Sequence, residues 1–287
     1  MKSLESVLRS LFISVFPFTG LLVLTYGIVE FFKQDFSLGT LGMVFISATI
    51  VTFFAGLFLK PRARTDKNLF PYSVGIVLGV FISLFYSFIS GVHIYTIVPS
   101  LVLALGWIVY LKWYSVFKDR TNDILQIGNQ LPEFQLENYD KKSVSASSFH
   151  GDPSIFLFYR GNWCPLCMAQ IKEIAAQYEE LEKLGVNTVL ISPQPHTQTK
   201  KLVNKFKLNF NFLVDRKNKV AKQLGILAEN GIPAGFQVLG YDSDTVMPTV
   251  VITNKEGEII FADLTDNYRV RPEPETFLKV IKELISI

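Results

Sequence analysis

Residues 154–167 read SIFLFYRGNWCPLC, and this stretch decides the fold of the C-terminal part of the chain. The apolar run Ser154–Arg160 predicts a buried strand. The dipeptide Gly161-Asn162 then predicts a tight turn. Proline is favoured at the first position of a helix, so Pro165 predicts that a helix begins immediately after Cys164. The stretch therefore predicts a cysteine at the N-terminus of a helix that follows a strand.

The two cysteines of the chain, Cys164 and Cys167, predict a redox pair. Backbone N–H groups and the helix dipole favour a thiolate at a helix N-terminus, and Arg160 adds a positive charge, so we predict a lowered pKa for Cys164. Cys164 is then the attacking nucleophile. Cys167, one turn further along and more buried, is the resolving thiol. A zinc site would need scattered histidines as its remaining ligands, so neither a metal nor a cofactor is expected.

The rest of the C-terminal half alternates β-rich runs with segments that have apolar residues at helical spacing. This alternation predicts an α/β domain. Asn254–Gly257 reads as a hairpin turn between two β runs, so one edge of an otherwise mixed sheet should be antiparallel. Further strands are expected at 186–192, 210–214 and 249–253, and helices at 165–183, 198–206, 217–224 and 273–285.

The N-terminal part is far more apolar than the rest. The mean hydropathy of +0.30 is too high for a wholly soluble chain. Two uncharged runs of 20 and 24 residues, at 10–29 and 36–59, each suffice for one membrane crossing. A third, 68–111, has 44 residues and must fold back near Ser90–His93. We therefore expect a bundle of four transmembrane helices in 1–116, a polar linker over 117–126 and a redox domain over 127–287.

Lysines and arginines near the ends of the predicted spans indicate the orientation. Nine lie on the side of the N-terminus and only Lys33 lies on the other, which predicts an integral, multi-pass membrane protein with both termini and the redox domain in the cytoplasm. The net charge of +3 comes from these loops, so the lipid bilayer is an expected partner and nucleic acid is not. The spans hold no acidic, basic or cysteine residue, which favours an anchor over an ion or electron pathway. The nine are Lys2, Arg9, Lys60, Arg62, Arg64, Lys67, Lys112, Lys118 and Arg120.

Three motifs give the C-terminal part a resemblance to a known family: Gly128–Leu136 (GNQLPEFQL), Phe158–Cys167 (FYRGNWCPLC) and Met247-Pro248-Thr249 before a strand. Over roughly residues 127–287 the sequence resembles the thioredoxin superfamily, and within it the alkyl hydroperoxide reductase and thiol-specific antioxidant (peroxiredoxin-like, redoxin) branch. The resemblance implies a thioredoxin-like fold and an antioxidant or oxidoreductase activity at a redox-active disulfide. It also implies that Pro248 is cis and lies against this disulfide, where the backbone beside it accepts an extended substrate.

The chain departs from the peroxiredoxin pattern around the cysteines. That family commonly shows P-x-x-x-T/S-x-x-C, but Leu157 and Gly161 occupy the proline and threonine positions counted back from Cys164. Met247 stands where an arginine commonly precedes the strand. Three arginines could replace it: Arg160, Arg269 and Arg271. The last two belong to a mixed charge run, with Asp263 and Asp266, that we otherwise expect to be a solvated face.

The intact C-x-x-C motif favours a membrane-tethered thiol-disulfide oxidoreductase, acting with a protein or small-thiol partner of the thioredoxin or glutathione type. One alternative is a peroxiredoxin-type thiol peroxidase that takes peroxide, with Cys164 peroxidatic and Cys167 resolving. A second alternative is a non-enzymatic redox sensor. Trp163 either shields the thiolate from water or simply packs over the sheet. The residues expected to tune the thiolate or bind substrate are Arg160, Trp163, Pro165, Pro248 and Thr249.

Overall fold

The computed structural model describes residues 4–33, 37–118 and 120–285. The chain divides into two compact units. The helical unit comprises Leu11–Pro61 and Thr65–Val116. The sheet unit comprises Met1–Ser10, Arg62–Arg64 and Phe117–Ile287. Two short N-terminal segments therefore belong with the C-terminal domain.

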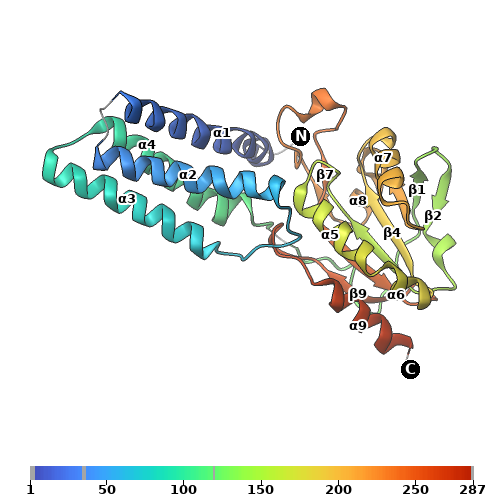
Figure 1. The fold of residues 1–287 in the computed structure, drawn as a ribbon. Helices are drawn as coiled ribbons and strands as arrows, with labels where there is room; N and C mark the ends of the chain where they lie inside the picture. The colour runs from blue at the N-terminus through green and yellow to red at the C-terminus, as the bar shows by residue number, and fades with distance from the viewer. Residues whose placement is uncertain (1–3, 34–36, 119, 286–287) are drawn as a thin grey trace. The chain divides into compact units, whose positions relative to one another are not determined.

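The N-terminal part of the chain forms four helices that are long and apolar enough to cross a membrane (Figure 1). The prediction of four long apolar helices is confirmed, and their insertion in a membrane stays a prediction. The helices are α1 (Leu4–Phe32), α2 (Leu38–Leu59), α3 (Phe70–Ser90) and α4 (Ile94–Val109), the last continued by a π-helical turn over Tyr110–Tyr114.

Small residues allow α2 and α3 to approach closely. A Cβ added to Gly42 would lie 2.6 Å from the carbonyl oxygen of Gly79, and one added to Gly79 would lie 2.8 Å from that of Gly42. Such contacts are typical of helices that associate in an apolar environment. The hydroxyls of Ser83 and Ser100 bond to one another at 3.0 Å and join α3 to α4. The glycines and serines within the apolar runs thus have a packing role.

The sheet unit contains a seven-stranded mixed sheet with the strand order β2-β1-β5-β4-β3-β8-β9. The central strands β3, β4 and β5 are parallel, and the outer pairings are antiparallel. This confirms the predicted thioredoxin-like fold with a mixed sheet. The strands are β1 (Gln135–Asn138), β2 (Ser143–Ser145), β3 (Ser154–Phe158), β4 (Asn187–Ser192), β5 (Asn211–Val214), β8 (Thr249–Thr253) and β9 (Ile259–Asp263), with a separate ribbon of β6 (Leu227–Ala228) and β7 (Thr245–Val246).

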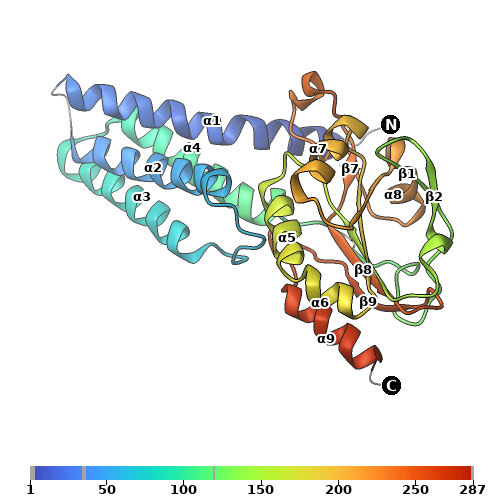
Figure 2. The ribbon, with the colours of Figure 1, turned by 45° about the vertical axis from the view of Figure 1, so that its right-hand side comes forward.

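Side chains that alternate along β3 divide the core into two layers. Phe156 and Phe158 join a buried cluster that includes Val220 of α8. On the other face, Phe261 of β9 contacts Phe277 of α9. Figures 1 and 2 both show α6 lying beside α9. The helices are α5 (Pro165–Ala176), α6 (Tyr178–Lys183), α7 (His196–Phe206), α8 (Lys219–Gln223) and α9 (Pro274–Ile285), with short 3-10 turns at Ala146–Phe149, Arg216–Asn218 and Phe236–Leu239.

The predicted hairpin turn between two β runs is present. Asn254 accepts hydrogen bonds from the backbone of Glu256 and Glu258, and Gly257 has a φ of 85°, which disfavours any residue with a Cβ. The helix expected over 165–183 is instead two helices, because Gln177 leaves the helical conformation at φ −100° and ψ 9°. Local sequence thus predicted the turn and missed the break.

Candidate functional site

The two cysteines lie at the point where β3 passes into α5. Gly161 has a φ of 146°, and a Cβ there would lie 2.6 Å from the indole nitrogen of Trp163, so the turn requires glycine. The N–H of Cys164 donates to the carbonyl of Gly161 at 3.2 Å and closes the turn. Cys164 is the N-cap residue of α5 and the half-buried Pro165 is its first residue, as the sequence predicted.

A second loop holds this turn from the side. Gln194, in the loop after β4, accepts a hydrogen bond from the N–H of Asn162 at 2.8 Å and donates to the hydroxyl of Tyr159 at 3.1 Å. The side chain of Gln194 is 1% exposed, so both bonds are shielded from water. The carboxyl ends of two parallel strands, β3 and β4, thus fix the backbone that leads into Cys164.

Both cysteines are free and buried, with Cys164 2% exposed and Cys167 0% exposed. The two thiols are hydrogen-bonded to each other, and the backbone N–H of Arg160 also donates to Cys167. Burial raises the pKa of Cys164, and the bond to Cys167 raises it further. The prediction of a lowered pKa at Cys164 is therefore wrong, because the Cys164 thiol and the Arg160 N–H both donate hydrogen bonds to Cys167.

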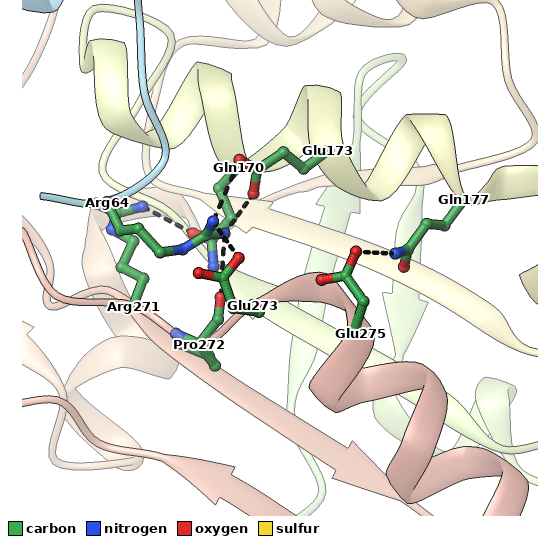
Figure 3. A network of polar contacts seen from close by, with 8 residues as sticks. All are labelled: Arg64, Gln170, Glu173, Gln177, Arg271, Pro272, Glu273 and Glu275. Carbon is green, nitrogen blue, oxygen red and sulfur yellow. Dashed lines mark hydrogen bonds and ion pairs between the residues drawn. The ribbon is translucent and has the colours of Figure 1, made fainter.

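Cys167 is the thiol that the structure stabilises as a thiolate. Burial opposes ionisation, but the hydrogen bond from Cys164 and the charge of Arg271 outweigh it and hold the pKa of Cys167 well below its ordinary value. The guanidinium of Arg271 donates to Cys167 Sγ at 3.4 Å and to Gln170 Oε1 at 2.7 Å, and Figure 3 shows the second of these bonds. Arg271 is 5% exposed, so its charge is little screened by water. The charged centre of the site is the Arg271–Cys167 pair.

Arg160 is a second arginine near the dithiol, and it is 6% exposed. Its guanidinium donates to the carbonyl of Gly231, lies 4.9 Å from the ring centre of Trp163 and lies 5.6 Å from that of Tyr268. Trp163 is half-buried and also contacts Phe236 edge-on at 5.6 Å. Trp163 therefore packs over Arg160 beside the cysteine turn, and a role in shielding the thiolate stays a prediction.

The expectation of a cis proline is wrong. No peptide bond within the described ranges is cis, so Pro248 is preceded by a trans bond. Its carbonyl accepts from Arg120 Nη2 at 3.3 Å, and the Thr249 hydroxyl accepts from the same nitrogen at 3.0 Å. Both residues are buried. Arg120 thus occupies the backbone that was expected to receive an extended substrate.

The charge run after β9 is not a solvated face. Arg269 is 0% exposed and Arg271 is 5% exposed, whereas only Asp266 is exposed as expected. Burial raises the pKa of Asp263 to about 6, against the charges of Arg120 and Arg271. Of the three arginines considered as replacements for the one missing at Met247, Arg271 contacts a cysteine, and Arg160 lies in the same site.

Sequence reasoning missed several polar partners of this site. Gln170 stands three residues after Cys167 on the same helix, so helical spacing could have identified it. No local signal pointed to Gln194, to Arg120 or to Arg64, because each acts on residues far away in the sequence. Arg120 lies in the segment predicted as a polar linker, yet it bonds to Thr249 of the sheet unit. Leu125, in the same segment, is 1% exposed and packs into the core of that unit.

Comparisons with known proteins find similarity in the C-terminal part of the chain. Residues 127–262 match the family model described as the AhpC/TSA family. The chain is 28% identical over 160 residues to the Haemophilus influenzae protein named "Putative peroxiredoxin bcp", covering 56% of this chain and 98% of that protein. It is 34% identical over 102 residues to chloroplastic peroxiredoxin Q of Oryza sativa subsp. japonica, covering 36% of this chain and 47% of that protein, so it spans about half of that relative.

A solved structure of a peroxiredoxin-like protein from Aquifex aeolicus is also similar. It is 18% identical and superposes with a TM-score of 0.47, over 56% of this chain and 88% of that one.

Proposed function

We propose that this chain is a thiol-based oxidoreductase, and specifically a membrane-tethered thiol peroxidase with Cys164 and Cys167 as its redox pair, on the basis of the match of residues 127–262 to the AhpC/TSA family. One observation carries the proposal. The Arg271 guanidinium lies 3.4 Å from Cys167 Sγ within a dithiol that is almost closed to solvent. A buried thiolate beside a cation is suited to attack a small, uncharged oxidant.

Burial favours a peroxide over a protein disulfide as the oxidant. With Cys164 2% exposed and Cys167 0% exposed, the folded domain offers no sulfur surface on which a protein disulfide could dock. The backbone at Pro248, where disulfide exchange was expected to hold an extended chain, is bonded to Arg120. Disulfide exchange with a protein is therefore the recycling step rather than the first step, which reverses the order of preference from the sequence.

In the first step, the Cys167 thiolate attacks one oxygen of the peroxide. The S–O bond forms, the O–O bond breaks, and Cys167 becomes a sulfenic acid while the peroxide is reduced to an alcohol or water. The Cys164 thiol is hydrogen-bonded to Cys167, so it gives its proton to the departing oxygen. Arg271 stabilises the negative charge before and during this transfer. The attacking and resolving roles are thus exchanged relative to the sequence prediction.

In the second step, the Cys164 thiolate attacks the sulfenic sulfur of Cys167. A disulfide forms and hydroxide leaves, taking a proton from solvent to become water. The two residues are separated by one helical turn, a spacing that a disulfide can bridge. A dithiol protein or two small thiols then reduce this disulfide by exchange, after local opening of the turn.

The test compares two oxidants on the full chain in detergent. The pre-reduced protein is mixed with hydrogen peroxide or with a protein disulfide, and loss of free thiols is followed by rapid quenching and alkylation. We expect saturating oxidation by peroxide and much slower oxidation by the disulfide. Cys167→Ser should abolish peroxide consumption, and Cys164→Ser should leave a single turnover that ends at a sulfenic acid trapped by dimedone. Fast reaction with the protein disulfide and none with peroxide would instead assign disulfide exchange.

We propose that the sheet unit and both termini face the cytoplasm, on the basis of the positive-inside pattern. The test uses a chain with both native cysteines changed to serine. In this background, Ser148→Cys at an exposed position of the sheet unit is compared with Val92→Cys in the loop between α3 and α4. Val92 is 84% exposed and lies in the loop predicted on the opposite side. A membrane-impermeant maleimide should label Val92→Cys in intact cells and Ser148→Cys only after lysis. Labelling of Ser148→Cys without lysis overturns this orientation.

A further inference from the structure

Arg64 lies in a segment, Arg62–Arg64, that is compact with the sheet unit although it is more than 50 residues earlier in the chain than Phe117. Its guanidinium forms ion pairs with Glu173 on α5 and with Glu273 just before α9 (Figure 3). Arg64 Nη2 also donates to the carbonyl of Pro272 at 3.3 Å. The Arg64 side chain is 22% exposed. One cation thus joins two elements that are distant in sequence from it.

These two elements carry the charged centre of the redox site. Cys167, Gln170 and Glu173 are spaced three residues apart and lie along one face of α5. Arg271 contacts the first two of them. Arg64 lies beside Glu173, the next residue on this face of α5. It bonds both to Glu173 and to the carbonyl of Pro272, which directly follows Arg271. Figure 3 shows the guanidinium groups of Arg64 and Arg271 next to each other beside α5.

The arrangement depends on the positive charge of Arg64. Glu173 and Glu273 both bond to it, so their carboxylates face each other across a single cation. Without that cation, like charges would repel and separate α5 from the segment after β9. Arg271 is attached to that segment, so its guanidinium would move away from Cys167.

We propose that Arg64 is a positioning residue for the redox centre: it holds the segment 271–273 against α5 and thereby holds Arg271 on Cys167. It touches no reacting atom and acts through Arg271. The proposal rests on the proposed function in taking Cys167 as the attacking thiolate. A second consequence is that a segment from the N-terminal half of the sequence, Arg62–Arg64, contributes to the redox site within the sheet unit.

The test uses the full chain in a Cys164→Ser background, so that Cys167 is the single thiol. The pH midpoint of its alkylation is measured for Arg64→Ala, for the conservative Arg64→Lys and for the matched control Arg62→Ala, which removes an exposed arginine from the same segment. We expect Arg64→Ala to raise the midpoint by about one pH unit. Arg64→Lys should recover most of this shift, and Arg62→Ala should leave the midpoint unchanged.

A double variant separates positioning from general stability. Glu273 is 59% exposed, so Glu273→Gln is tolerable, and it removes one of the two facing carboxylates. Combined with Arg64→Ala, it should return the midpoint part of the way to the parent value. A lowered melting temperature with an unchanged midpoint in Arg64→Ala overturns the proposal. Absence of peroxide consumption by the parent chain, with the midpoint shift present, overturns the peroxidase and leaves the positioning role standing.

Discussion

Replacing Arg271 by glutamine should raise the pKa of Cys167 and slow its oxidation. The guanidinium lies 3.4 Å from the sulfur in the buried site. At an effective dielectric constant of about 20, two unit charges at that distance attract by about 5 kcal/mol, or between three and four pKa units at about 1.4 kcal/mol each. The guanidinium charge is delocalised, and the Arg160 N–H still donates to the sulfur, so we expect a rise of about 1–3 units. At a pH below both pKa values, the thiolate population falls about 10- to 1000-fold.

The assay is an ultraviolet titration of the thiolate in the full chain with Cys164→Ser, from acid to alkaline pH. Arg271→Lys keeps the charge and should leave the midpoint nearer to that of the parent than Arg271→Gln does. Lys279→Gln is the matched control, because Lys279 is an exposed cation on α9 near the same segment in sequence. An Arg271→Gln protein that is folded by circular dichroism and titrates with the parent refutes the assignment of Cys167 as the thiolate stabilised by Arg271.

Three further predictions concern other parts of the sheet unit. Trp163→Ala removes the ring over Arg160, so the dithiol should react faster with a neutral alkylating reagent, and the free energy of unfolding in urea should fall by about 1–3 kcal/mol. Asp263 has a pKa raised by burial to about 6, so the folded state prefers its neutral form; stability should fall as pH rises from about 4 to about 6, and Asp263→Asn should flatten urea midpoints across that window. Ile252→Ala in β8, where the side chain is 0% exposed, should cost about 2–5 kcal/mol in urea, against less than about 0.5 kcal/mol for Ile285→Ala at the 49% exposed end of α9.

Local patterns predicted those parts of the fold that local forces determine. The strand before Gly161, the turn and the start of α5 at Pro165 follow from the conformational preferences of these residues, and all are present. The four N-terminal helices follow from the lengths of uncharged runs. The break at Gln177 was missed because apolar spacing continues through it, while its backbone conformation does not.

The site was predicted less well, because its electrostatics are not local. The helix N-terminus favours a thiolate at Cys164, but Arg271, 104 residues after Cys167, reverses the order of the two pKa values. Composition made the run around Arg269 look solvated, although its burial depends on packing against distant elements. Arg64 bonds to Glu173 across 109 residues and carried no sequence signal except a loop charge.

Oxidation of the dithiol removes the negative charge of the Cys167 thiolate, which Arg271 stabilises. In the disulfide form Cys167 bears no negative charge, so the buried Arg271 loses the thiolate that it contacts and keeps its hydrogen bond to the amide of Gln170. Only the reduced state has the attraction between the Arg271 guanidinium and the Cys167 thiolate, so the reduced state is stabilised relative to the oxidised one. The reduction potential of the pair is thereby raised, and the disulfide is an easily reduced one that weak thiol donors can return to the dithiol. The same imbalance predicts that the oxidised protein is the less stable of the two, so each catalytic cycle loosens the site when the reductant must enter it.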